Sequence, residues 1–176
     1  MVVDRRVRFE LLYGKYAAAV KAYVMRRAGE SIADDVVAEV FVVCWRRFDD
    51  VPAEPLPWLL GVARKVLSTQ WRGEQRREAL TQRLQRDSDP PVGALQSSED
   101  GVLADALGRL SENDRELLLL IAWDGMTPSS AAAVLGIKPA TARVRLLRAR
   151  RRLTVALGRA ESAPRLCTPL SMEVPS

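Results

Sequence analysis

A helix–turn–helix sequence pattern near the C-terminus constrains the fold of this chain more than any other feature. Thr127 and Pro128 are typical of a helix N-cap and a first helical residue, and Gly136 is typical of a turn. Pro139 then begins a second helix, which we expect to end near Leu157. Apolar residues spaced by four, three and four positions predict one buried stripe on this second helix: Ala142, Leu146, Ala149 and Leu153.

The same stretch is strongly basic, because residues 138–159 contain eight basic residues and no acidic one. On the second helix of such a pair, arginine side chains can address guanine edges in the major groove while DNA phosphates supply affinity. The alternative is an amphipathic surface helix with solvated arginines, although such a face usually mixes Glu with Arg. Ser129 and Ser130 could bind a phosphate or simply start the first helix. The expected DNA-binding residues are Ser129, Ser130, Lys138, Thr141, Arg143, Val144, Arg145, Arg148 and Arg152.

A second basic window lies upstream, where residues 64–86 contain seven basic and two acidic residues. The windows carry +5 and +8 against +5 for the whole chain, so the remainder carries −8. Two basic surfaces on an acidic body predict two separate contacts with a polyanion. Tryptophans beside the cations could stack on unpaired bases, although a core role explains Trp58 equally well. The expected set here is Trp58, Arg64, Lys65, Ser68, Trp71 and Arg72.

The N-terminal half reads as three helices. The first spans residues 5–28, and a capping box from Ser31 to Asp34 begins the second, which ends near Phe48. Its expected buried stripe is Val37, Val40, Phe41, Cys44, Trp45 and Phe48, whereas Asp35, Ala38, Glu39 and Val42 face elsewhere. Residues 49–57 predict an ordered loop, and Pro57 starts a third helix that runs to the region of Arg72.

The C-terminal half begins after a polar, proline-containing stretch. We expect residues 1–81 to form one domain, 82–100 a flexible linker, 101–159 a second domain and 160–176 a flexible tail. A capping box from Ser111 begins a helix that ends at Gly125. The predicted class is therefore all-α, with two small helical domains on a tether and the helix–turn–helix in the second.

Several function classes are excluded by what the sequence lacks. There is no histidine, no phosphate-binding glycine loop and no nucleophile beside a base, so we expect no enzyme, no cofactor and no metal site. Cys44 is expected to be a buried thiol, and Cys167 lies in the polar tail. No signal peptide is visible, and the longest apolar run has seven residues against the roughly 20 that span a bilayer. These features predict a soluble protein of a reducing cytoplasm.

Four segments resemble the extracytoplasmic function sigma factors of bacterial RNA polymerase, in order and spacing, over residues 5–157. Phe9–Tyr16 resembles the start of their second conserved region, and Ala33–Phe48 resembles their polymerase-docking helix. Pro57–Arg64 is similar to the element that opens the −10 promoter region. Leu110–Arg150 resembles the fourth region, which reads the −35 element.

The resemblance assigns the residue sets to roles. It implies that the helix–turn–helix set reads the −35 element, and that the upstream basic set recognises and melts the −10 element. It also implies that the acidic face of Asp35, Ala38, Glu39 and Val42 docks on the β and β′ subunits of polymerase core. An anti-sigma protein is an implied further partner. Without the resemblance, the acidic face could equally be a solvated helix surface.

Two other functions fit parts of the sequence. A free-standing helix–turn–helix regulator would bind an operator without polymerase, but it leaves the basic window that includes Trp71 and Arg72 without a role. An interaction protein that binds only another protein leaves the charge of residues 138–159 unexplained. An initiation subunit uses both surfaces and is the favoured interpretation.

Overall fold

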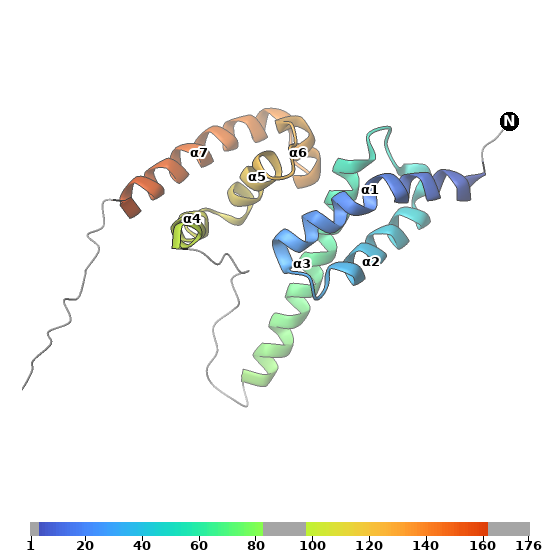
Figure 1. Cartoon of the computed structure of the whole chain (residues 1–176), viewed down its shortest axis with the longest axis horizontal. Helices are drawn as coiled ribbons and strands as arrows, with labels where there is room; N and C mark the ends of the chain where they lie inside the picture. The colour runs from blue at the N-terminus through green and yellow to red at the C-terminus, as the bar shows by residue number, and fades with distance from the viewer. Residues whose placement is uncertain (1–3, 83–97, 162–176) are drawn as a thin grey trace, which may run out of the picture.

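The computed structural model describes residues 4–82 and 98–161, and every regular element within these residues is helical. This confirms the predicted all-α class. The N-terminal unit contains α1 (Arg5–Ala28), α2 (Ala33–Arg46), a short 3-10 helix (Phe48–Asp50) and α3 (Pro55–Gln82). The C-terminal unit contains α4 (Ser98–Gly108), α5 (Glu112–Ala122), α6 (Pro128–Leu135) and α7 (Pro139–Glu161). Figure 1 shows α6 lying next to the N-terminal unit, with α7 running away from it.

Helix α1 spans the residues that the sequence predicted, because both of its ends carry clear signals. The carboxylate of Asp4 accepts a hydrogen bond from the backbone N–H two residues on, at 3.2 Å, and so caps the first turn. Gly29 follows the last turn at a φ of 81°, a conformation that costs glycine little. Arg26 and Arg27 lie in the last turn, where the negative end of the helix dipole stabilises their positive charges.

The prediction of a capping box from Ser31 to Asp34 is wrong. Helix α2 begins at Ala33 after Ile32, whose side chain makes no capping hydrogen bond. Asp34 and Asp35 lie in the first turn, after the cap position, and their negative charges interact favourably with the positive end of the helix dipole.

Helix α3 is longer than predicted at both ends. It begins at Pro55 rather than Pro57, because a proline in the first turn lacks only an N–H that has no partner within the helix. It continues to Gln82, well beyond Arg72, through a segment rich in Glu, Gln, Arg and Ala, which are strong helix formers.

An aromatic cluster corrects the expected end of α2. The helix ends at Arg46, and the buried Phe48 lies in the 3-10 helix that follows. Trp45, predicted in the buried stripe, is 41% exposed. Phe9 of α1, itself partly buried, packs edge-on against Trp45, Phe41 and Phe48, with ring centroids 5.1 to 6.2 Å apart, and the Trp45 indole lies at the edge of this cluster.

The capping prediction at Ser111 is half confirmed. Its hydroxyl accepts a hydrogen bond from the N–H of Asp114 at 3.3 Å, but the Asp114 carboxylate binds Arg152 rather than the cap. Helix α5 ends at Ala122, and the glycine expected to end it, Gly125, follows with a φ of 63°.

The outer ends of the C-terminal unit also extend beyond their predicted bounds. Helix α4 begins at Ser98 rather than near Gly101, and α7 continues to Glu161 rather than ending near Leu157. The expected linker and tail fall largely on residues outside the described part of the chain, so their boundaries stay predictions.

One hydrophobic core runs through both units. In the N-terminal unit α1, α2 and α3 pack on one another, and in the C-terminal unit α7 packs against α4, α5 and α6. Helix α3 also packs against α6, which joins the two halves of the core. At this crossing Gly61 faces the backbone of α6, where an added Cβ would lie 3.5 Å from the carbonyl oxygen of Val134.

Candidate promoter and polymerase interfaces

The local geometry of α6 and its turn confirms the predicted helix–turn–helix. The Thr127 hydroxyl accepts a hydrogen bond from the N–H of Ser130 at 3.1 Å, and Pro128 occupies the first helical position. Gly136 adopts the left-handed conformation at a φ of 66°. The N–H of Ile137 then donates to the carbonyl of Ala132 at 3.0 Å, which fixes the path into α7.

Helix α7 buries the predicted stripe and presents a broad outer face. Ala142, Leu146 and Ala149 are buried, and Leu153 packs against them at the edge of the core. Among the predicted −35 residues, those exposed on this helix or just before it are Lys138, Thr141, Arg143, Val144, Arg148 and Arg152. Leu147, which the predicted set left out, is 53% exposed beside Val144 and Arg148.

Arg145, one of the expected DNA-binding residues, is not fully exposed. It is half-buried and lines a polar hollow together with Arg148 and Arg152 of α7. The opposite wall of this hollow is the start of α5, formed by Ser111, Asn113 and Asp114. The partial burial arises because residues 145 and 152, seven apart on one face of α7, turn toward α5.

The charges around this hollow favour an anion. Nη1 of Arg152 donates to Oδ2 of Asp114 at 2.9 Å, so one carboxylate faces three guanidinium groups. The helix N-terminus at Ser111 adds further positive potential. Asp114 is a residue that the sequence-based site missed, and its buried position between α5 and α7 was not visible in the charge pattern.

The two serines of α6 differ in availability. Ser130 is engaged in the cap through its N–H, and its hydroxyl lies 2.9 Å from that of Thr127. Ser129 is exposed. The structure therefore leaves Ser129 as the better placed of the two for a phosphate contact.

The predicted −10 residues all lie on α3, but they differ in surroundings. Lys65, Trp71 and Arg72 are exposed, with Trp71 at 39%. Ser68 is half-buried, and its carbonyl accepts a hydrogen bond from Nε of Arg72 at 2.9 Å. Trp58 packs partly buried against the core, which fits the core role left open for it.

Arg64 is the exception within the −10 set, because it contacts the other unit. Its Nη2 donates to Oδ1 of Asn113 at the start of α5, at 2.9 Å. Asn113 also lines the hollow that Arg145, Arg148 and Arg152 share. Asn113 therefore accepts a hydrogen bond from one arginine of the −10 set and lines the hollow that holds three arginines of the −35 set.

The expected docking face on α2 is exposed as predicted. Asp35, Ala38 and Glu39 lie on the surface, and Val42 is 47% exposed. Trp45 extends this face by almost one turn, since it lies three residues after Val42. The three-residue spacing from Val42 could have placed Trp45 on this exposed face, but its aromatic side chain favoured a core assignment.

Trp45 is held in place by α1. Nη2 of Arg5 donates to the Trp45 carbonyl at 2.7 Å, and the Arg5 guanidinium lies 5.1 Å from the centre of the indole ring. The docking face therefore ends in an ordered, half-exposed aromatic side chain.

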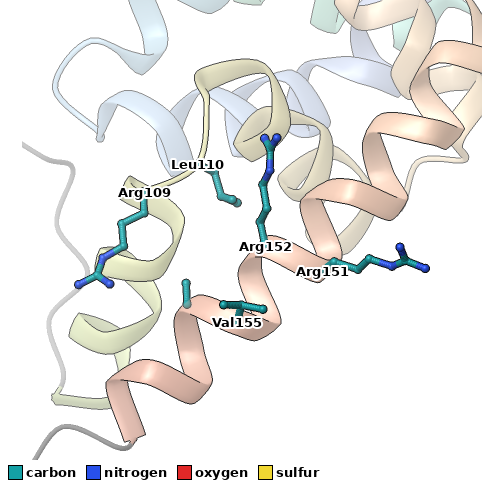
Figure 2. A pocket seen from close by; sticks show the side chains of 6 residues that line it. Arg109, Leu110, Arg151, Arg152 and Val155 are labelled. Atoms are coloured by element: carbon teal, nitrogen blue, oxygen red, sulfur yellow. The ribbon is translucent and has the colours of Figure 1, made fainter.

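A second hollow lies between α4 and α7. Leu110, Val155 and Ala156 line it, and Figure 2 shows that Arg109 and Arg151 point away from its centre. It holds neither an acid nor a nucleophile.

The described residues contain no group of three or more histidine, cysteine, aspartate or glutamate side chains that could hold a metal ion. Cys44 is fully buried, and burial raises the pKa of its thiol above the ordinary 9.0. Cys167 lies outside the described residues. No described helix is long and apolar enough to cross a membrane.

Two family models match the chain. Residues 12–77 match sigma-70 region 2, and residues 101–153 match sigma-70 region 4. The RNA polymerase sigma factor NccH of Alcaligenes xylosoxydans xylosoxydans is 30% identical over 138 residues, which cover 73% of this chain and 74% of NccH. The probable sigma factor RfaY of Xanthomonas campestris pv. campestris is also 30% identical, but the match covers 67% of this chain and only 32% of RfaY.

The protein is therefore a sigma factor of bacterial RNA polymerase, a subunit class that directs polymerase to promoters and initiates transcription. Within that class it belongs to the extracytoplasmic function type. ECF sigma factor SigL of Mycobacterium tuberculosis is 29% identical over 158 residues, which cover 83% of this chain and 86% of SigL. The resemblance seen in the sequence is confirmed.

Solved structures show the same fold. CnrH in complex with the cytosolic domain of CnrY is 29% identical, with a TM-score of 0.57 over 88% of this chain and 90% of CnrH. The sigma factor RpoE from Bartonella quintana, in complex with the anti-sigma factor NepR, has a TM-score of 0.63 over 86% of this chain and 97% of RpoE. RpoE is 24% identical, and its likeness concerns the fold.

Proposed function

We propose that the two units divide promoter recognition between them. In this division α7 enters the major groove of the −35 element, and the exposed face of α3 binds and opens the −10 element. The observation that carries the proposal is the cationic outer face of α7, the second helix of a confirmed helix–turn–helix, which matches sigma-70 region 4. Lys65, Trp71 and Arg72 provide a second exposed surface on α3, with a ring that can stack on an unpaired base.

Residue roles follow from exposure. Arg143 and Arg148 are exposed and can contact phosphates or base edges, whereas Arg145 is half-buried and Arg152 is paired with Asp114 at the polar hollow. On α2, Asp35, Ala38, Glu39 and Val42 form the docking face for the β and β′ subunits of core. Because core polymerase and the nucleoid occupy the cytoplasm, the proposed location of the protein is cytoplasmic.

A protein partner of anti-sigma type belongs to the same proposal. The solved structure of CnrH holds the cytosolic domain of CnrY, which supports a comparable partner for this chain. Val42 on α2 and Val144 on α7 are both exposed, and each lies beside charged residues of its own helix. A partner that contacts both units would bury each valine as an apolar contact surrounded by polar ones.

The proposal is tested with holoenzyme reconstituted from core polymerase and the full chain. Promoters are first selected from a random DNA library by the holoenzyme, and the complexes are then footprinted with and without core. We expect protection at two elements and permanganate-reactive thymines at the downstream one. Core alone and the chain alone serve as controls. Tight binding of the chain alone to a single operator, with no core-dependent opening, contradicts the division of roles.

A further inference from the structure

A buried cluster of charges joins the two units. Nε of Arg27, in the last turn of α1, donates to both carboxylate oxygens of Glu116 on α5, at 3.0 and 2.9 Å. Nη2 of the same guanidinium donates to Oδ2 of Asp124 at 2.9 Å. The side chains of Arg27, Glu116 and Asp124 are 6%, 11% and 4% exposed. Arg26 forms a further ion pair with Asp124.

Tyr23 completes the cluster. Its hydroxyl donates to Oε1 of Glu116 at 2.8 Å, and its ring lies 3.7 Å from the guanidinium carbon of Arg27. Its carbonyl accepts from Nη1 of Arg27 at 3.2 Å, so all the guanidinium nitrogens of Arg27 have partners. A buried ion pair is favourable only when such additional hydrogen bonds compensate for lost hydration. This cluster meets that condition.

The signs of the charges divide by unit. The N-terminal unit contributes two arginines, Arg26 and Arg27, and the C-terminal unit contributes two carboxylates, Glu116 and Asp124. Separation of the units would expose all four to water. Closure is therefore specified by complementary charges as well as by the apolar crossing of α3 and α6.

This closed arrangement conflicts with simultaneous promoter contacts. Arg64 of the −10 set is bonded to Asn113, which shares a hollow with Arg145 and Arg148 of the −35 set. Promoter elements about two helical turns apart are separated by roughly 70 Å of DNA. Surfaces that meet at one asparagine cannot reach both elements at once.

We propose that the structure is a closed resting form of the sigma factor, locked by the cluster of Arg26, Arg27, Glu116 and Asp124. Closure withholds Arg64 from the −10 element, and the units must separate before both promoter elements are engaged. The occlusion part of this inference rests on the promoter-reading roles proposed above, whereas the lock rests only on the contacts between the units.

The lock is tested first in the free full-length chain, without DNA or polymerase. Spin labels are placed at Ala18→Cys on α1 and Thr154→Cys on α7, both exposed, in a Cys167→Ser background, while the buried Cys44 stays unlabelled. Double electron–electron resonance then reports the distance distribution between the units. A single narrow distribution is expected for the wild-type sequence. A broad distribution in the wild-type chain overturns the lock.

The decisive variant is Glu116→Gln with Asp124→Asn, which keeps the side-chain shapes and removes both negative charges. Removal of the carboxylates leaves Arg27 buried without a counter-charge, so the units should separate and the distribution should broaden to longer distances. Arg27→Gln removes the opposite partner and should give the same result. The control is Asp50→Asn, which removes the exposed pair with Arg47 inside one unit and should change nothing. Circular dichroism confirms that each variant is folded.

A second measurement links the lock to function. If the closed form makes up about 90% of the free chain, opening should lower the apparent Kd for a core–promoter assembly about tenfold. We expect this gain for both the carboxylate variant and the Arg27 variant. An unchanged distance distribution in either folded variant overturns the lock. Separation of the units without any gain in assembly leaves the lock standing and overturns its role in withholding the promoter surface.

Discussion

The arginines around the polar hollow differ in what surrounds each guanidinium. Arg152 is paired with Asp114, Arg145 is half-buried against α5, and Arg148 is exposed. A guanidinium whose orientation is already restricted by neighbouring residues loses less conformational entropy when it makes two parallel hydrogen bonds to a base. An exposed guanidinium is better suited to a phosphate, which accepts contacts from many directions. We therefore expect sequence specificity to come more from Arg145 than from Arg148.

Alanine variants at these two positions separate the roles. Arg145→Ala should cost roughly 1–3 kcal/mol of −35 affinity and relax one base position. Arg148→Ala should weaken all sequences alike and reduce the slope of log K against log salt by about 0.9. Fluorescence anisotropy of the holoenzyme on single-base promoter variants, over a salt series, measures both effects. Wild-type behaviour of both variants contradicts this assignment of the α7 face.

Cys44 predicts a pH dependence of stability. In the folded protein, burial keeps the Cys44 thiol protonated at pH values above its ordinary pKa of 9.0. As the pH rises, the unfolded chain therefore loses this proton before the folded chain does. The free energy of unfolding should therefore fall as the pH rises above about 9, by at most about 1.4 kcal/mol per pH unit for this group. Urea unfolding at pH 8, 9 and 10 measures the fall. Cys44→Ala should show a shallower fall, and an equal fall in both proteins rules out the thiol as its source.

Single-residue environments were only partly predictable from the sequence. Periodicity correctly placed Ala142, Leu146 and Ala149 in the core, because helical spacing alone decides which side is buried. For Trp45, the aromatic side chain was given more weight than the three-residue spacing from Val42. For Arg145 the spacing failed, because its partial burial depends on residues of another helix, at the start of α5. Local spacing carries no information about such neighbours.

Among the helices, those with chemical signals at their ends were predicted best. Helices α1 and α6 carry a capping side chain at the start and a glycine with positive φ just after the end, and their bounds were recognised. Helix α2 begins without a side-chain cap, and α3 ends in a segment that has no breaker. Where propensity changes gradually, sequence alone cannot fix where a helix begins or ends.

The exposed face of α2 can be tested as an element. Asp35→Lys with Glu39→Lys should weaken binding to core polymerase about tenfold or more, because a partner surface complementary to the acidic face of α2 would then meet positive charges. Folding should be unaffected, since exposed substitutions usually change stability by within about 0.5 kcal/mol. Glu54→Lys, an exposed acid outside α2, is the matched control. A pull-down with core and circular dichroism provide the measurements. Undiminished binding by the folded double variant contradicts docking through this face.

For the whole molecule, two linked DNA surfaces impose a geometric requirement on the promoter. Insertion of five base pairs between the −35 and −10 elements rotates one of them by about half a helical turn. We expect initiation to be lost while binding to the isolated −35 element is retained. Transcription assays and footprints on the paired promoters test this expectation. Unchanged initiation from the lengthened promoter contradicts a fixed spacing between the two DNA surfaces in the holoenzyme.

The crossing of α3 and α6 has a steric consequence. An alanine Cβ at position 61 would lie 3.5 Å from the Val134 carbonyl oxygen, which is ordinary contact, but a leucine has no room there. Gly61→Ala should keep the units together and raise stability by up to about 1 kcal/mol, since glycine is a poor helix former. Gly61→Leu should act as a wedge, lengthening the distance between the spin labels while all four charges remain intact. The size of a single side chain would then set how far apart the two halves of the molecule stand.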